Sequence, residues 1–138
     1  MQSDICITCT PSKKYFLLRE YISPGTFIAA VGADSEDKQE LEPSLLVSGK
    51  VVTDITGQSA TIGELHHAIE QGLTTIDSVH AELGQIISGQ KPGRESDEEI
   101  VIFDSTGTAL QDVAAAAIVY EKALINKIGT NLNFSDIL

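Results

Sequence analysis

The chain has 138 residues, of which 20 are acidic and nine are basic, so its formal net charge at pH 7 is −11. This length allows one hydrophobic core, and the excess negative charge repels the phosphates of nucleic acids and anionic lipids. No apolar stretch approaches the roughly 18 residues that span a bilayer, and the first four residues lack the basic region of a signal peptide. We therefore expect one cytoplasmic domain that has neither a nucleic acid nor a membrane as its partner.

Strand patterns alternate with helix patterns along the chain. Short apolar and β-branched runs between turn residues indicate strands, and apolar residues three and four positions apart indicate helices. This alternation is typical of parallel strands joined by right-handed crossovers. Residues 13–21 are mixed and fit either a short helix or an extended piece. The predicted strands are residues 4–9, 28–31, 50–54 and 99–104, and the predicted helices are residues 40–48, 61–71, 79–88 and 107–125.

The predicted helix ends carry recognisable signals. Thr61 to Glu64 has the spacing of a capping box, and Gly49 stands where a C-cap glycine would follow the helix over residues 40–48. The helix over residues 107–125 is rich in alanine and apolar on most of its circumference. We expect it to be buried on more than one side, either by a sheet and another domain or by a second copy of the chain. The residues after Asn131 lack periodicity and predict a tail.

The run Val31-Gly32-Ala33-Asp34 is the most informative stretch of the sequence. An apolar strand that ends in a glycine turn and then presents a carboxylate places a charge in the crevice beyond the strand ends of an open α/β sheet. The pattern points to a dinucleotide-dependent active site. A second interpretation is that Asp34 caps the helix or turn after its strand. No G-x-G-x-x-G phosphate loop occurs in the 138 residues, so the chain carries only part of such a site.

Cys6 and Cys9 have the C-x-x-C spacing of redox pairs and of half a zinc site. On a strand, however, residues three apart point to opposite faces, so their sulfur atoms diverge. A redox pair instead needs a helix N-terminus that lowers the pKa of one thiol. We expect two ordinary strand cysteines, and a thiol or zinc protein is the alternative.

Two further clusters have structural interpretations. The adjacent His66 and His67 point about 100° apart on a helix, so we expect no metal there. Ser105 lacks the glycine that precedes the serine of a nucleophile elbow, because position 103 is Phe. The turn Asp104–Gly107 is expected instead to cap the long helix after it, whose N-terminus also attracts anions.

Five motifs in order resemble one family of enzymes. They are SDICITCTPS at residues 3–12, GTFIAAVGAD at 25–34, KQEL at 38–41, DSVHAELG at 77–84 and FDSTGTALQDVA at 103–114. Together they resemble the ornithine cyclodeaminase, μ-crystallin and archaeal alanine dehydrogenase family, and GRESDEEI at 93–100 favours the alanine dehydrogenase branch. The resemblance covers nearly all of this chain but only the C-terminal part of such an enzyme. A full member has an N-terminal substrate domain, then a Rossmann domain, and finally returns to the first domain.

The resemblance implies oxidative deamination of a small amino acid with NAD or NADP. Hydride moves from the α-carbon to the nicotinamide, and the imine is hydrolysed or attacked by a side-chain amine. Asp34 matches the acid/base carboxylate, and its presence favours deamination over the chemistry of the μ-crystallin branch. The positions matched to the cofactor are Thr10, Pro11, Ser12, Val31, Gly32, Ala33, Lys38 and Ser105, and those matched to the substrate are Asp34 and Thr106.

The expected fold is a single α/β domain over residues 1–138. It consists of a partial Rossmann-like parallel sheet of about four strands, flanking helices and a long alanine-rich C-terminal helix. Without a phosphate loop, the chain alone should bind NAD or NADP weakly or not at all, and should turn over no substrate unless the N-terminal part is supplied. The alternative is a free-standing homo-oligomeric binding or structural module. An unpaired sheet edge and a bare helix face predict a homodimer, with exchanged elements as one arrangement.

Overall fold

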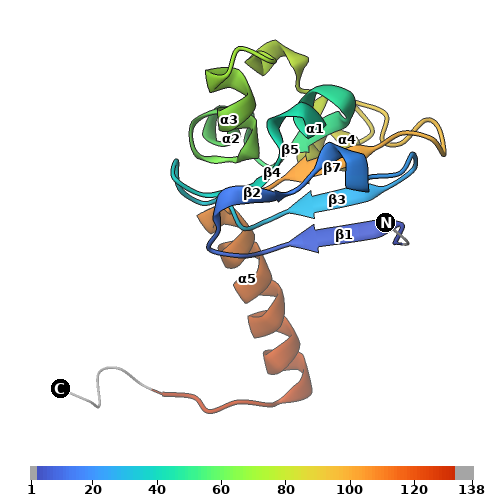
Figure 1. Cartoon of the computed structure of the whole chain (residues 1–138). Helices are drawn as coiled ribbons and strands as arrows, with labels where there is room; N and C mark the ends of the chain where they lie inside the picture. Colours follow the sequence, from blue (N-terminus) through green and yellow to red (C-terminus); the bar gives the residue numbers. More distant parts are fainter. Residues whose placement is uncertain (1–2, 133–138) are drawn as a thin grey trace. The chain divides into compact units, whose positions relative to one another are not determined.

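The computed structural model describes residues 3–132, and its centre is a five-stranded parallel sheet (Figure 1). Every neighbouring pair of strands is parallel, which confirms the predicted α/β class. The sequence prediction lacked one strand of this sheet, a two-residue strand that is too short to leave a pattern. The strand order across the sheet is β1 (Ile5–Thr8), β3 (Phe27–Ala30), β7 (Val101–Asp104), β5 (Lys50–Thr53) and β6 (Ala81–Glu82).

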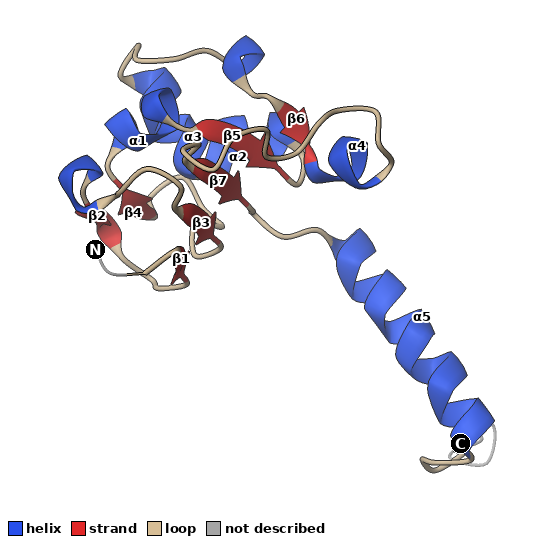
Figure 2. Cartoon of the chain, turned by 90° about the vertical axis from the view of Figure 1, so that its right-hand side faces the viewer, coloured by secondary structure: helices blue, strands red, loops and turns tan. Residues whose placement is uncertain are grey.

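A second, two-stranded parallel sheet pairs β2 (Lys13–Leu17) with β4 (Gln39–Leu41). The mixed segment after Pro11 is therefore extended, and a 3-10 turn over Arg19–Tyr21 follows it. The helices and the remaining turn are shown by type in Figure 2, where α4 lies beside β6. They are α1 (Pro43–Ser48), α2 (Thr56–Ile62), α3 (Glu64–Glu70), a 3-10 turn (Ile76–Ser78), α4 (Leu83–Ile87) and α5 (Ala109–Asn126).

Two of the predicted helices are wrong at their N-terminal ends. The helix predicted from residue 40 begins only at Pro43, because Glu40 and Leu41 belong to β4. The helix predicted over residues 79–88 begins only at Leu83, because β6 comes first. A strand of two or three residues is hard to distinguish from the start of a helix by sequence, because so few apolar positions fit both the strand period of two and the helix period of 3.6 residues.

The capping signals also differ from their prediction. Gly63 separates α2 from α3, so the helix predicted over residues 61–71 is two helices. The capping box lies instead at Glu82, whose backbone N–H donates to Gln85 Oε1 at 3.0 Å. The N-cap of α5 is Thr108, which accepts from the backbone N–H of Gln111, so the prediction that Asp104–Gly107 caps this helix is wrong.

The core lies between the sheet and helices α1 and α3, which lie on the same side of the sheet (Figure 1). Alternate strand residues point to this side, since Ile28 pairs in register with Ile102 and both are fully buried. Leu45 of α1 and Ala68 of α3 complete the packing. The same register sets the strand ends level, so that all five parallel strands finish at one edge of the sheet.

The chain divides into two compact units, the first ending at Gly107 and the second beginning at Thr108. In the second unit, α5 ends at Lys127, which has the left-handed φ of 54°. Within its own unit, no residue of α5, all of which are described, is buried, and the surface that covers this helix stays a prediction. Its exposed large apolar residues are Leu110, Val113, Ile118, Val119, Tyr120, Leu124 and Ile125.

Among the described residues, no helix combines the length and the apolar character that crossing a membrane requires. The predicted tail after Asn131 lies outside the described residues, apart from Leu132.

Candidate functional site

The carboxyl ends of the parallel strands bring the loops matched by the family motifs to one edge. The N–H of Val31 donates to the carbonyl of Thr8 at 2.9 Å, which joins the ends of β3 and β1. The N–H of Ser105 donates to the carbonyl of Ala30 at 2.9 Å, which joins the ends of β7 and β3. Residues 10–12, 31–34 and 105–106 therefore leave adjacent strands side by side.

Asp34 is the exposed carboxylate of this edge. Its Oδ1 lies 2.6 Å from Lys38 Nζ, and the side chains are 61% and 26% exposed. The hydrogen bond from Lys38 and its positive charge hold the pKa of Asp34 below its ordinary value, so the carboxylate is ionised at neutral pH. No helix follows Asp34, because the next element is β4 after a turn closed by the Lys38 N–H on the Ser35 carbonyl. This leaves Asp34 as an acceptor rather than a helix cap.

A buried carboxylate lies beneath Asp34 and connects two of the loops. Glu40 is fully buried, and its Oε1 accepts from the N–H of Thr10 at 2.5 Å. A Cβ on Gly32 would lie 2.5 Å from this carboxylate, so only glycine permits so close an approach. Among residues 3–132, no group donates a hydrogen bond to the second oxygen, Oε2. Glu40 therefore fixes the spacing between the loop after β1 and the loop after β3.

Two more buried carboxylates continue inward from Glu40. The N–H groups of Glu40 and Leu41 donate to the two oxygens of Glu64 at 2.7 and 3.0 Å. The N–H groups of Glu64 and Leu65 donate in turn to the two oxygens of Asp104 at 3.1 and 2.9 Å. Asp104, the last residue of β7, thus satisfies the first N–H groups of α3. We call Glu40, Glu64 and Asp104 the buried carboxylate set.

Burial changes the protonation of two members of this set. Loss of hydration raises the pKa of Glu64 to about 8 and that of Asp104 to about 7. The donated backbone hydrogen bonds lower both pKa values, but burial has the larger effect. Nearby carboxylates add to the rise, Asp104 and Glu40 for Glu64, and Asp54 for Asp104. Both side chains therefore exchange a proton near neutral pH.

Asp54 holds the turn that follows β7. Its Oδ2 accepts from the hydroxyl of Ser105 at 3.1 Å, from the N–H of Thr106 at 2.9 Å and from the N–H of Gly107 at 2.8 Å. The Thr106 hydroxyl donates to the other oxygen, Oδ1, at 3.3 Å. Because the Ser105 hydroxyl donates its hydrogen bond to Asp54, the Ser105 oxygen is left to act only as an acceptor toward a ligand.

The loop after β1 carries the three remaining cofactor candidates. The N–H of Ser12 donates to the Thr10 hydroxyl at 3.2 Å, and the Ser12 hydroxyl donates to the Lys14 carbonyl at 2.6 Å. These bonds form a tight turn around Pro11. In the neighbouring loop, Val31 is 38% exposed and Ala33 is fully buried, so Val31 presents more surface to a ligand than Ala33 does.

The cysteines do not form a reactive pair. Both are free thiols, with Cys6 in β1 and Cys9 one residue beyond the end of that strand. Burial raises the pKa of the Cys6 thiol, and the nearby Glu40 raises it further. A raised pKa disfavours the thiolate that redox chemistry and zinc binding require.

Sequence reasoning found Asp34 and Lys38 but missed the residues that support them. Asp54, Glu40, Glu64 and Asp104 were read as ends or interiors of regular elements. Their partners are backbone N–H groups between 23 and 53 positions away, which leave no trace in residue type. One signal was available, namely a carboxylate directly after an apolar strand, as in the run ending at Asp104.

Residues 1–127 match the family described as ornithine cyclodeaminase/mu-crystallin. The chain belongs to this family. It is 47% identical over 131 residues to the alanine dehydrogenase of Archaeoglobus fulgidus, covering 95% of this chain and 41% of the relative. Two solved structures share its fold. An archaeal alanine dehydrogenase dimer with bound NAD has a TM-score of 0.86, 46% identity and coverage of 95% and 41%. The iminosuccinate reductase of Paracoccus denitrificans with NAD⁺ has a TM-score of 0.88, 40% identity and coverage of 97% and 41%.

The chain thus spans about two fifths (41%) of the length of that curated relative. The relatives of this family member include dehydrogenases, reductases and cyclodeaminases. Its residues fit a dinucleotide only in part. The loops matched to the cofactor leave adjacent strand ends, but the 138 residues contain no G-x-G-x-x-G loop to hold a pyrophosphate.

Proposed function

We propose that this chain supplies the C-terminal part of an NAD(P)-dependent amino-acid dehydrogenase or ornithine cyclodeaminase. The observation that carries the proposal is the ionised Asp34, paired with Lys38 at the end of β3 and flanked by the loops after β1 and β7. NAD or NADP, when bound, supplies the hydride acceptor for the α-carbon of the amino acid. The membership of the family and the NAD-bound relatives support this reaction class.

Asp34 acts on the amine side of the reaction. An ionised carboxylate stabilises the ammonium group of a substrate and the iminium cation that replaces it, and it accepts a proton within hydrogen-bond reach. Lys38 keeps the pKa of Asp34 low, so the group is charged before the substrate arrives. The Asp34 side chain is 61% exposed, so a small amino acid can reach it.

The neighbouring residues complete the proposed site. Thr106 lies beside the substrate position, and Ser105 presents its oxygen to the cofactor because its proton is held by Asp54. The nicotinamide end of the cofactor would lie against the two loops fixed by Glu40. These loops contribute Thr10, Pro11, Ser12, Val31, Gly32 and Ala33, and Lys38 follows them.

The 138 residues alone are proposed to bind NAD or NADP weakly or not at all, and to be inactive. A dinucleotide owes much of its affinity to a pyrophosphate held by backbone N–H groups at a helix N-terminus, and the motif that builds such a site is absent. Small amino acids become substrates only when the rest of the protein is supplied.

A chimera tests the proposal. The 138 residues replace the matched segment of the Archaeoglobus fulgidus alanine dehydrogenase, with which they share 47% identity. We expect NADH formation with alanine, ornithine or proline from the chimera and none from the 138 residues alone. Asp34→Asn in the chimera should lower kcat at least about 100-fold while leaving NADH binding unchanged. Robust turnover by the isolated chain, or a chimera that binds NADH but does not depend on Asp34, would refute the proposal.

A second function, a homo-oligomeric module, is favoured by α5. An 18-residue helix is marginal by itself in water, and α5 exposes large apolar residues such as Val113, Ile118 and Leu124. We propose that a second copy covers them in a homodimer, as the dimeric archaeal relative suggests. Light scattering at micromolar concentration should give twice the chain mass, and Ile118→Asp should halve it. A monomeric mass for the unaltered chain would contradict this proposal.

We also propose a cytoplasmic location, which the two free thiols support, since exposed cysteines such as Cys9 stay reduced there.

A further inference from the structure

Three side chains of types that bind metals converge on α3, next to the backbone of Lys38. His66, His67 and Glu70 each offer one ligand atom, and these three atoms lie within 4.8 Å of one another. His66 Nε2 is 4.0 Å from Glu70 Oε2, across one helical turn. Zinc binds histidine nitrogen and carboxylate oxygen at about 2.0–2.2 Å, which places two tetrahedral ligands roughly 3.4 Å apart. Reaching that spacing closes the 4.0 Å separation by about 0.6 Å, and any separation as wide as 4.8 Å by about 1.4 Å.

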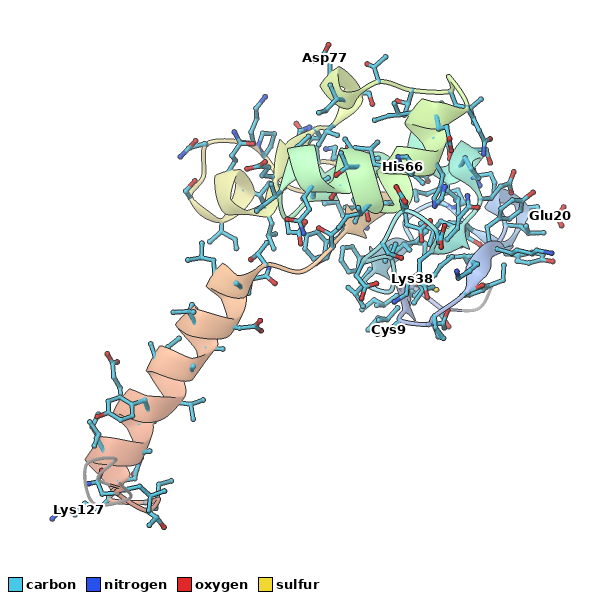
Figure 3. All side chains as sticks on the ribbon, turned by 90° about the vertical axis from the view of Figure 1, so that its left-hand side faces the viewer. Cys9, Glu20, Lys38, His66, Asp77 and Lys127 are labelled. Atoms are coloured by element: carbon cyan, nitrogen blue, oxygen red, sulfur yellow. The ribbon has the colours of Figure 1, made fainter. Side chains whose placement is uncertain are left out.

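His67 is already oriented as a metal ligand is. One of its ring nitrogens, Nε2, lies 2.7 Å from the backbone carbonyl of Lys38. A carbonyl can only accept a hydrogen bond, so Nε2 carries the proton and Nδ1 keeps its lone pair. Histidines that bind metals almost always donate their second ring N–H to a carbonyl or carboxylate in this way, which fixes the tautomer and the ring plane. Figure 3 shows the labelled His66 on α3 and Lys38 below it in the view.

The helix that carries the three side chains is packed and hydrogen-bonded on its inner face. Leu65 and Ala68, on the inner face of α3, are fully buried, and Glu64 is held by two backbone N–H groups. His66 is 26% and Glu70 71% exposed, so an ion reaches them from solvent and a water molecule can complete its shell. Lys38, whose backbone carbonyl contacts His67, has its ammonium paired with Asp34 at 2.6 Å.

We propose that His66, His67 and Glu70 form a binding site for a divalent transition-metal cation, with Zn²⁺ as its ligand. Two imidazole nitrogens and one carboxylate oxygen are the donors that zinc accepts, and three protein ligands leave the fourth position to water. The side chains of this site differ from those assigned to the proposed deamination, and the proposal does not depend on that reaction. It reverses the expectation, based on the divergence of neighbouring helix residues, that these histidines bind no metal.

Titration of the 138-residue chain with ZnCl₂ at pH 7.5 by calorimetry tests the site. The titration is performed in a Cys6→Ser/Cys9→Ser background, so that thiols contribute nothing. We expect one Zn²⁺ per chain, with His66→Ala and Glu70→Gln each weakening affinity at least about tenfold. Lowering the pH to 5.5 should release the ion, because protonated imidazoles do not bind it. Circular dichroism of each variant confirms that it is folded.

His80 provides the matched control. Its Nε2 also lies within hydrogen-bond distance of a backbone carbonyl, that of Pro92 at 2.8 Å, but it lies outside the cluster on α3. His80→Ala should therefore leave the Zn²⁺ affinity unchanged. The proposal is overturned if the thiol-free chain shows no saturable binding, or if folded His66→Ala and Glu70→Gln variants bind as tightly as their parent. Equal losses for His80→Ala and His66→Ala would overturn it as well.

Discussion

Two kinds of carboxylate lie at the same edge of the sheet in opposite environments. Asp34 is exposed and paired with Lys38, which lowers its pKa. Glu64 and Asp104 are buried and accept only backbone N–H groups, and their pKa values rise to about 8 and about 7. The exposed group keeps its charge at neutral pH, whereas the buried groups are poised to gain a proton.

This difference in environment assigns the exposed carboxylate to the proposed reaction and the buried carboxylates to holding the loops in place. A carboxylate that has to receive a cationic amine must be charged and reachable, and Asp34 is both. A carboxylate that has to hold loops together must be fixed, and the buried carboxylate set achieves this by accepting paired N–H groups from β4 and α3. Removal of a buried member should therefore affect the fold, and removal of Asp34 only the proposed reaction.

The largest effect is expected for Glu64→Ala. This change leaves the buried N–H groups of Glu40 and Leu41 without an acceptor, and each such loss costs about 1–3 kcal/mol. We expect the free energy of unfolding, measured by urea titration with circular dichroism, to fall by about 3–5 kcal/mol. Glu70→Ala, on the exposed face of the same helix, is the control and, measured in EDTA so that the proposed metal site is empty, should leave the free energy of unfolding nearly unchanged. Equal losses from the two changes would show that Glu64 holds nothing specific.

The free energy of unfolding should depend on pH, because two members of the buried carboxylate set bind protons more tightly in the folded chain. The pKa values of Glu64 and Asp104 lie above their ordinary values of 4.5 and 3.8, so between about pH 4 and 8 the folded chain binds more protons than the unfolded chain. The free energy of unfolding should therefore fall as pH rises through this window, with the larger share between pH 5.5 and 8.5 coming from Glu64.

Urea titrations at a series of pH values measure this slope. The glutamine of Glu64→Gln cannot ionise, so this variant should lose the part of the pH slope that Glu64 contributes. A free energy of unfolding that increases from pH 5.5 to 8.5 would contradict the raised pKa values.

Gly32→Ala should have a smaller effect and probes the contact between the two regions. The new Cβ would lie 2.5 Å from the buried carboxylate of Glu40, so one of the two has to move. Overpacking of this kind costs about 1–3 kcal/mol. Gly57→Ala is the matched control, because a Cβ at that position in α2 meets nothing within 4 Å and should stabilise the helix by about 0.4–1 kcal/mol. Thermal melts of both variants measure the contrast, and a neutral Gly32→Ala would show that the Glu40 contact is loose.

Asp34→Asn should have the smallest effect on the fold. Exposed ion pairs contribute little to stability, so the urea midpoint of the 138-residue chain should not change. A clear loss of stability would mean that Asp34 supports the loop, and the separation of chemistry from support would fail at this residue.

The sequence predicted the elements with strong local patterns and missed those defined by distant partners. The four strands with apolar runs and the glycine turn before Asp34 were visible, because each depends on neighbouring residues. The strand β6 has two residues and no pattern of its own. The break at Gly63 depends on Asp104, whose Oδ2 would lie 2.6 Å from a Cβ at that position, and these residues are 41 positions apart.

The residues of the candidate site likewise fall into those that the sequence revealed and those that it did not. Asp34 and Lys38 are four positions apart and were found together, since both belong to motifs of the family. Asp54 reaches the turn after β7 from 51 to 53 positions away and was seen only as the end of a strand. Residue type alone does not reveal a carboxylate whose partners are backbone N–H groups, because every residue except proline has one.

The position of β7 in the sheet has a consequence for the order of folding. Among the strands of the described residues it comes last in the chain, yet it lies between β3 and β5, which are joined to each other only through it. Before β7 pairs, the five-stranded sheet can exist only as two separate pairs, β1 with β3 and β5 with β6. Each then exposes an open edge to which any extended segment can bind. Completion of the sheet requires closing loops of about 50 to 75 residues in one late step, so we expect slow refolding and sensitivity to aggregation until β7 is in place.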